Sequence, residues 1–172
     1  MPDWIDSFLE QNSIDKNDFE AAIRQDILEF CLKKITAYMD ESDSNFFEIK
    51  SLFLRNKSIK ATNMVVSRVC HCSFLSEDYK WLNKCLVAFF KKTNRKALNI
   101  EKKEDILKKQ SYKCAICNKQ INLENAEIDH IIPFDIVGDE LDDNYQALCS
   151  NCNRRKSDTL SISLENLIYK KK

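Results

Sequence analysis

The chain has 172 residues, of which 44% are hydrophobic and 31% are charged. This composition is typical of a soluble globular protein and argues against an intrinsically disordered chain. No apolar run approaches the roughly 20 residues that a transmembrane helix needs, and the acidic N-terminus is unlike a signal peptide, so we expect a cytoplasmic protein.

Positive and negative charges are segregated along the chain, although the formal net charge is zero. Residues 1–50 contain five Lys and Arg against twelve Asp and Glu, whereas residues 51–100 contain ten against two. Contacts from Lys and Arg to phosphates supply most of the non-specific affinity of a protein for nucleic acid. The basic central segment is therefore a candidate docking surface for nucleic acid. The alternative interpretation is a solvated helical face.

The pattern of the first hundred residues predicts helices. Asp15 or Asn17 can cap a helix whose apolar residues recur at three- and four-residue spacing. These residues are Phe19, Ile23, Ile27, Phe30, Cys31, Ile35 and Tyr38. A short, deeply buried helix is expected from about Phe46 to near Asn56, and a further helix is expected to begin at Ser76. Residues 58–70 have a mixed pattern that predicts no particular element.

The sequence changes character after its first hundred residues. With one Gly and two Pro in the whole chain, helix breakers are scarce, which favours helices and gives no flexible linker. A helix over about 100–110 leads into a segment of paired cysteines and short alternating runs, and further helices are expected near 151–157 and 164–170. We expect a mainly α fold with a small α+β module, divided into a helical domain over 1–99 and a second domain over 100–172.

The helical domain is expected to contribute target recognition or a surface for a partner. Its phenylalanines exceed what a small helical bundle is expected to bury, and they include Phe46, Phe47, Phe53 and Phe89. Apolar surface that a bundle leaves uncovered marks interaction sites. We therefore expect this domain to form a homodimer or to bind a partner protein.

Four of the eight cysteines form two C-x2-C pairs, Cys114 with Cys117 and Cys149 with Cys152. Two such pairs can present four thiolates in the tetrahedral arrangement that structural zinc prefers. A segment of about 45 residues cannot bury enough surface to fold alone, and coupled metal binding can supply on the order of 10 kcal/mol. We therefore predict a structural Zn²⁺ with no coordination position left for catalysis.

The other four cysteines give no comparable signal. Cys31 and Cys85 lie in apolar helical stripes, where a buried structural thiol is the favoured interpretation. Cys70-His71-Cys72 is too tightly spaced for a standard zinc knuckle, and nothing upstream supplies a clear partner pair. A second metal site is therefore not favoured.

The segment between the cysteine pairs carries further polar residues in a recognisable order. These are Asp129-His130-Ile131-Ile132-Pro133, Asn144, and Leu148-Cys149-Ser150-Asn151-Cys152-Asn153-Arg154-Arg155-Lys156. Together with Cys114 and Cys117 they resemble the pattern of the HNH endonuclease family over about residues 100–160. The resemblance implies a ββα-metal fold, with antiparallel strands around 127–132 and 145–148 followed by a helix that begins in the second zinc knuckle.

Phosphodiester hydrolysis needs a deprotonated water, a neutralised phosphate and a stabilised leaving oxygen. A neutral imidazole titrates near the working pH, and the resemblance implies that His130 is the general base. Asp129, one residue earlier on an extended strand, points to the opposite face. The resemblance implies that Asp129 and Asn153 hold a catalytic Mg²⁺ or Mn²⁺, whose preferred ligands are such hard oxygens, and that Asn144 orients the loop. Helix capping by Asn153 and ordinary turn chemistry at Asn144 are the alternatives.

The basic triplet Arg154, Arg155 and Lys156 is expected to contact nucleic-acid phosphates, with solvation of the helix as the alternative. The predicted function is a metal-dependent endonuclease that hydrolyses phosphodiester bonds in double-stranded DNA, of restriction or phage-defence type. The alternatives are a zinc-stabilised nucleic-acid-binding protein without cleavage and a nuclease that acts on RNA or single strands.

Overall fold

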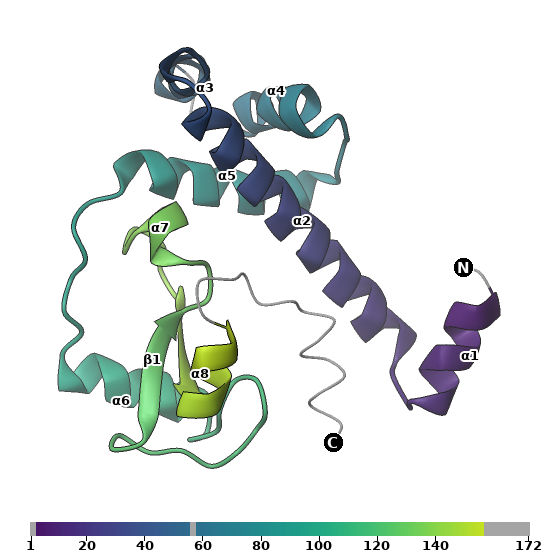
Figure 1. Ribbon diagram of the computed structural model, residues 1–172, viewed down its shortest axis with the longest axis vertical. Helices are drawn as coiled ribbons and strands as arrows, with labels where there is room; N and C mark the ends of the chain where they lie inside the picture. Colours follow the sequence, from purple (N-terminus) through teal and green to yellow (C-terminus); the bar gives the residue numbers. More distant parts are fainter. Residues whose placement is uncertain (1–2, 56–57, 157–172) are drawn as a thin grey trace. The chain divides into compact units, whose positions relative to one another are not determined.

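The computed structural model describes residues 3–55 and 58–156, in which helices predominate and the strands form one small sheet (Figure 1). The chain divides into two compact units that are discontinuous in sequence. Among the described residues, the first comprises 3–27, 98–131 and 145–156, and the second comprises 28–55, 58–97 and 132–144. These contact-based units differ from the predicted division into domains 1–99 and 100–172. That division stays a prediction.

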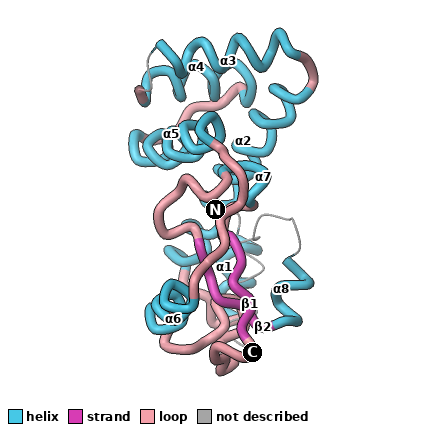
Figure 2. Tube along the Cα trace, turned by 90° about the vertical axis from the view of Figure 1, so that its left-hand side faces the viewer, coloured by secondary structure: helices cyan, strands magenta, loops and turns pink. Residues whose placement is uncertain are grey.

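The first unit contains a β-hairpin between two helices. Strand β1 (Ala126–His130) pairs antiparallel with β2 (Tyr145–Cys149), with Ile128 opposite Ala147 and His130 opposite Tyr145. The two strands lie side by side in Figure 2. Helix α6 (Ile100–Lys109) packs against β2, and helix α8 (Ser150–Lys156) follows β2 directly and packs against both strands. The predicted mainly α fold with a small α+β module is confirmed.

The core of this ββα module is small. Its buried members are Ile106, Leu107, Cys114, Ile116, Ile121, Ala147, Leu148 and Cys152. The outer edge of β2 is closed by Gln110, whose side-chain Oε1 accepts from the Ala147 N–H at 2.8 Å and whose Nε2 donates to the Ala147 carbonyl at 3.0 Å. Because an unpaired strand edge is costly to bury, this glutamine fixes where α6 meets the hairpin.

The N-terminal part of the first unit is a helical corner. Helix α1 (Asp3–Gln11) is followed by α2 (Lys16–Asp40), whose first turn is capped by Asp15 Oδ1 through the N–H groups of Asn17 and Asp18. Leu9, Ile14 and Phe19 form a small buried cluster at this corner. The predicted cap and the predicted long helix are both confirmed.

The second unit is built from the rest of α2 with α3 (Asp43–Arg55), α4 (Ile59–Cys70), α5 (Ser76–Lys91) and the short α7 (Phe134–Val137). Helix α4 was not predicted, yet its buried residues recur at three- and four-residue spacing, as Thr62, Val65, Val66 and Val69. Helix α7 begins after Pro133 and packs against α5. The segment between β1 and β2 therefore contributes to the helical unit.

Two details of the predicted apolar faces are wrong. In α2, Ile27 and Phe30 are 47% and 65% exposed, and Leu28, Leu32 and Met39 are buried instead. In α3, Phe47 is 63% exposed although Ile49 and Phe53 are buried. Phe46, Phe53 and Phe89 each pack against the Phe90 ring, with centroids 5.3 to 6.0 Å apart, so most of the surplus phenylalanines serve this unit's own packing.

None of the helices in the described ranges combines the length and the apolar character that crossing a membrane requires. The helix predicted near 164–170 lies outside the described residues.

Candidate metal centres and nuclease site

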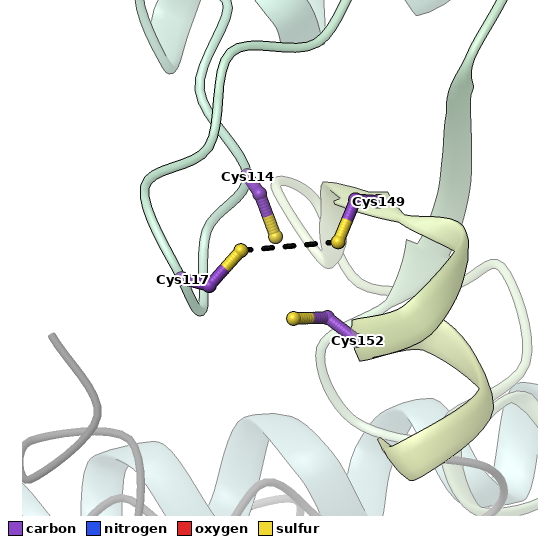
Figure 3. A group of neighbouring side chains, drawn as sticks. All are labelled: Cys114, Cys117, Cys149 and Cys152. Carbon is purple, nitrogen blue, oxygen red and sulfur yellow. Dashed lines mark hydrogen bonds between the residues drawn. The ribbon is translucent and has the colours of Figure 1, made fainter. Parts of the chain in front are cut away.

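Four cysteine sulfurs converge between the first knuckle and α8 (Figure 3). The Sγ atoms of Cys114, Cys117, Cys149 and Cys152 all lie within 4.8 Å of one another. Cys114 and Cys117 lie on a tight loop that Cys114 and Lys119 close by a backbone hydrogen bond, while Cys149 ends β2 and Cys152 lies in α8. The predicted pairing of the two C-x2-C motifs into one potential metal-binding cluster is confirmed.

The spacing of this cluster fits zinc. Four thiolates about 2.3 Å from a tetrahedral Zn²⁺ would have sulfurs about 3.8 Å apart, and the Cys117 and Cys149 sulfurs are 3.8 Å apart. Burial raises the pKa of the Cys114 thiol, but backbone N–H groups of Cys117, Cys149 and Ile116 outweigh it and lower that pKa to about 7. Burial raises the pKa of Cys152. Neighbouring thiolates repel one another, and a cation bound among them would offset that repulsion.

His130 ends β1 with its side chain inside the module. The residue is 7% exposed, and its ring lies 4.7 Å from the ring of Tyr145, its cross-strand partner, at an interplanar angle of 46°. Its backbone carbonyl accepts a hydrogen bond from Lys156 Nζ at 2.8 Å. The contact with the Tyr145 ring and the hydrogen bond that fixes the backbone of His130 together restrict the orientation of the imidazole.

Asp129 lies on the opposite face of β1 from His130, because successive residues of a strand alternate. Its Oδ2 atom lies 2.7 Å from Lys156 Nζ, and the two side chains are 22% and 2% exposed respectively. Oδ2 is buried and receives no hydrogen bond among the described residues, so the contact with Lys156 is an ion pair by distance without hydrogen-bond geometry. A buried carboxylate oxygen that receives no hydrogen bond can also coordinate a metal cation.

Asn153 meets the same face of β1 one turn earlier in α8. Its Nδ2 donates to Glu127 Oε2 at 2.5 Å. Glu127 and Asp129 are two residues apart on the strand, and Asn153 and Lys156 are three apart on the helix, so the two pairs face each other. In Figure 1, α8 lies alongside β1. The structure brings Asp129 and Asn153 to one strand–helix interface and gives each a different side-chain partner.

Asn144 is 4% exposed and acts on the backbone. Its Oδ1 accepts from the Ile132 N–H at 2.8 Å, and its Nδ2 donates to the Ile132 carbonyl at 2.9 Å. Both arms of the carboxamide thus hold one residue, two positions after His130 in the chain. This geometry suits an orienting residue better than a simple turn former.

The basic triplet is divided by the structure. Arg154 and Arg155 are exposed, and Arg155 lines a surface pocket with Lys119 and Asn125. Lys156 is only 5% exposed, which contradicts its predicted role as a phosphate contact, because its ammonium is turned inward onto Asp129 and the His130 carbonyl. The third cation of the triplet belongs to the interior of the module.

We expect the substitution Lys156→Met to lower the free energy of unfolding by about 3 kcal/mol, because it leaves the buried Asp129 oxygen without its counter-charge. The matched variant Arg154→Met, which removes an exposed cation from the same helix, should change it by less than about 0.5 kcal/mol. Urea denaturation of the zinc-loaded chain measures both. Equal stabilities of the two variants would show that the ion pair does not support the fold.

Sequence reasoning did not single out Glu127, Gln110 or the inward role of Lys156. The signal for Glu127 is its two-residue spacing from Asp129, which puts both on one face of a strand. The signal for Lys156 is its three-residue spacing from Asn153. Gln110 gives no signal along the chain, since its partner Ala147 is far away in sequence.

The family comparison matches this module. Residues 114–159 match the family described as HNH endonuclease. Comparisons with curated proteins and with solved structures give no match. The matched stretch begins at the first zinc-knuckle cysteine and includes β1, β2 and α8, so it covers the cysteine cluster and the polar strand–helix interface.

Proposed function

We propose that the chain, whose residues 114–159 match the HNH endonuclease family, is a metal-dependent endonuclease that hydrolyses phosphodiester bonds in double-stranded DNA. The observation that carries the proposal is the placing of His130 and Asp129 on opposite faces of β1, with Asn153 on the Asp129 side. A proton acceptor and hard oxygen ligands then flank one short strand. Mere binding of nucleic acid needs neither.

In this proposal His130 accepts the proton of the attacking water. Its imidazole is the only histidine ring of the first unit, and the Tyr145 ring and the fixed β1 carbonyl hold it in place. A general base works efficiently when its orientation is set before the substrate arrives. Asn144 is proposed to position His130 indirectly, because its two hydrogen bonds fix the backbone of Ile132, two residues further along the chain.

Asp129 and Asn153 would hold the catalytic cation, for which their oxygen donors suit Mg²⁺ or Mn²⁺ better than soft metals. When bound, such an ion supplies charge neutralisation at the scissile phosphate and at the leaving oxygen. Glu127 fixes the Asn153 carboxamide by accepting from its Nδ2, which determines where its oxygen lies. Lys156 holds the Asp129 carboxylate in position and offsets its charge.

Arg154 and Arg155 are the proposed phosphate contacts of the module, since both are exposed cations on the helix that carries Asn153. The helical second unit is proposed to add recognition, with its basic segment, or a surface for a partner protein or a second copy. A single nuclease site, the one proposed among the described residues, can cut both strands of a duplex only through pairing of two chains or through successive nicks. A cytoplasmic restriction or phage-defence role is consistent with such an enzyme.

A cleavage assay on supercoiled plasmid, single-stranded DNA and RNA tests the proposal. With Mg²⁺ or Mn²⁺ the plasmid should be nicked or linearised, and EDTA should abolish the reaction. Cleavage restricted to RNA or to single strands would show that the proposed substrate is wrong and that the proposed reaction, phosphodiester hydrolysis, is right. Tight binding of all three substrates without cleavage would favour the binding protein instead.

The ligand assignment predicts a change in metal requirement. We expect Asp129→Asn and Asn153→Ala each to raise the Mg²⁺ concentration needed for half-maximal cleavage by about 10- to 100-fold, because each removes or weakens a metal contact. Asp105→Asn removes an exposed carboxylate of α6 in the same unit and should leave that concentration unchanged. A lower maximal rate with an unaltered Mg²⁺ dependence would argue that neither residue binds the metal.

A further inference from the structure

Three cysteines of the second unit gather outside the zinc cluster. Cys31 lies in the middle of α2, Cys70 is the last residue of α4, and Cys72 begins the segment that leads to α5. The Sγ atoms of Cys31 and Cys72 are 4.0 Å apart, and the Cys70 thiol donates to the Cys31 carbonyl at 3.8 Å. Cys70 and Cys72 therefore both contact Cys31 of α2.

The backbone between them explains this convergence. His71 caps α4 in the left-handed conformation, with φ 56° and ψ 36°. Only a few per cent of non-glycine residues have a positive φ, and here it turns the chain sharply between the two cysteines. The following segment is held by the Phe74 N–H, which donates to the Tyr79 hydroxyl at 3.1 Å, and by the Leu75 N–H, which donates to Asp78 Oδ2 at 3.2 Å. Cys72 is thus fixed beside Cys31.

The trio does not resemble the zinc cluster. In the described ranges, the only group of three or more potential ligands whose donor atoms gather closely enough for a metal ion is the one formed by the four knuckle cysteines. Burial raises the pKa of Cys31 and also that of Cys70, so both remain protonated near neutral pH. The close Cys31 and Cys72 sulfurs, with no further metal ligands gathered around them among the described residues, suit two-electron oxidation to a disulfide better than metal binding.

We infer that Cys31 and Cys72 are an oxidisable dithiol that forms a reversible disulfide with a peroxide as oxidant. The sulfurs must approach by about 2 Å to reach the bonded distance. Cys31 is 3% exposed and Cys72 is half-buried, so the oxidant reaches Cys72 first. The inference does not depend on the nuclease function, since it concerns only residues of the second unit.

The chemistry balances with one hydrogen peroxide per disulfide. The Cys72 sulfur attacks a peroxide oxygen, the O–O bond breaks, and Cys72 becomes a sulfenic acid while one water leaves with the thiol proton. The Cys31 sulfur then attacks the Cys72 sulfur. The S–S bond forms, the S–O bond breaks, and a second water leaves with the Cys31 proton. Two thiols lose two electrons in total to the peroxide.

The test treats the zinc-loaded full chain with a small excess of hydrogen peroxide, blocks free thiols, and maps the linked peptides by mass spectrometry with fragmentation. We expect a Cys31–Cys72 link with a loss of two hydrogens, reversed by dithiothreitol. Because the disulfide would close the loop between α2 and the end of α4, oxidation should also raise Tm. Zinc release is measured in parallel to separate oxidation of the knuckle.

Matched variants make the result specific. Cys72→Ser should abolish both the link and the rise in Tm, whereas Cys70→Ser and Cys85→Ser should retain them, and circular dichroism checks that each variant is folded. Cys72→Ala serves if the serine variant misfolds. A link from Cys31 to Cys70, a sulfinic acid at Cys72 beside an unmodified Cys31, or oxidation confined to the zinc cysteines would each overturn the inference.

Discussion

Replacing His130 by alanine is expected to lower the rate of DNA cleavage by about 10²- to 10⁴-fold, the usual contribution of a positioned general base. The fold and the zinc content should be retained, because His130 is not one of the cluster cysteines and its removal leaves the hydrogen bonds of the β1–β2 pairing intact. Single-turnover cleavage of plasmid at saturating Mg²⁺ measures the chemical step directly. Binding of uncut DNA in EDTA should change little.

Two further variants separate loss of the base from loss of packing. His130→Asn keeps a polar side chain at this 7%-exposed position and should be as inactive as the alanine variant. His71→Asn replaces the other histidine of the chain with a residue that tolerates the left-handed conformation, and it should cleave at the wild-type rate. Wild-type cleavage by folded, zinc-loaded His130→Ala would remove His130 from the mechanism.

Much of the fold could be predicted from local patterns. The long helix α2, its Asp15 cap and helix α5 follow from apolar spacing and capping chemistry, which are properties of neighbouring residues. The hairpin strands were implied by the resemblance to the HNH endonuclease family. The four-cysteine cluster was predictable because two C-x2-C pairs restrict their geometry regardless of the rest of the fold. These features need little knowledge of tertiary contacts.

The faces of the helices were harder to predict. Ile27 and Phe30 fit the apolar spacing of α2 but are exposed, while Leu28 and Leu32 are buried. Both choices satisfy a helical period, so only the partners of the helix decide between them. In α4, small and polar residues such as Ala61 and Thr62 lie in the interior, which obscured the period of a helix that is otherwise regular.

The candidate site shows the same limit in its charges. Arg154, Arg155 and Lys156 look alike in sequence, yet each step along a helix turns the side chain by about 100°. Only Lys156 is turned toward β1, where Asp129 lies. The residue types at the site were therefore readable, but the division between cations that face solvent and the one that is buried required the packing of α8 on the strand.

Removing the zinc predicted for the four-cysteine cluster is expected to unfold the ββα module, and Cys149→Ser should have the same effect. Coupled zinc binding contributes on the order of 10 kcal/mol, which is comparable with the whole stability of a typical domain, about 5 to 15 kcal/mol. Two of the buried residues in the module's core cluster, Cys114 and Cys152, are themselves cysteines of the metal cluster. The remaining apolar core is too small to compensate for the loss.

Hydrogen exchange of the full chain before and after zinc chelation measures this effect element by element. Protection of the β1 and β2 amides should be lost, together with the 1:1 zinc content, whereas α4 and α5 of the second unit should remain protected. Cys85→Ala provides the matched control, since that cysteine is buried in α5 and is not a member of the cluster; its zinc content should stay at one. Zinc-free Cys149→Ser with wild-type protection in both strands would show that packing, not the metal, holds the hairpin together.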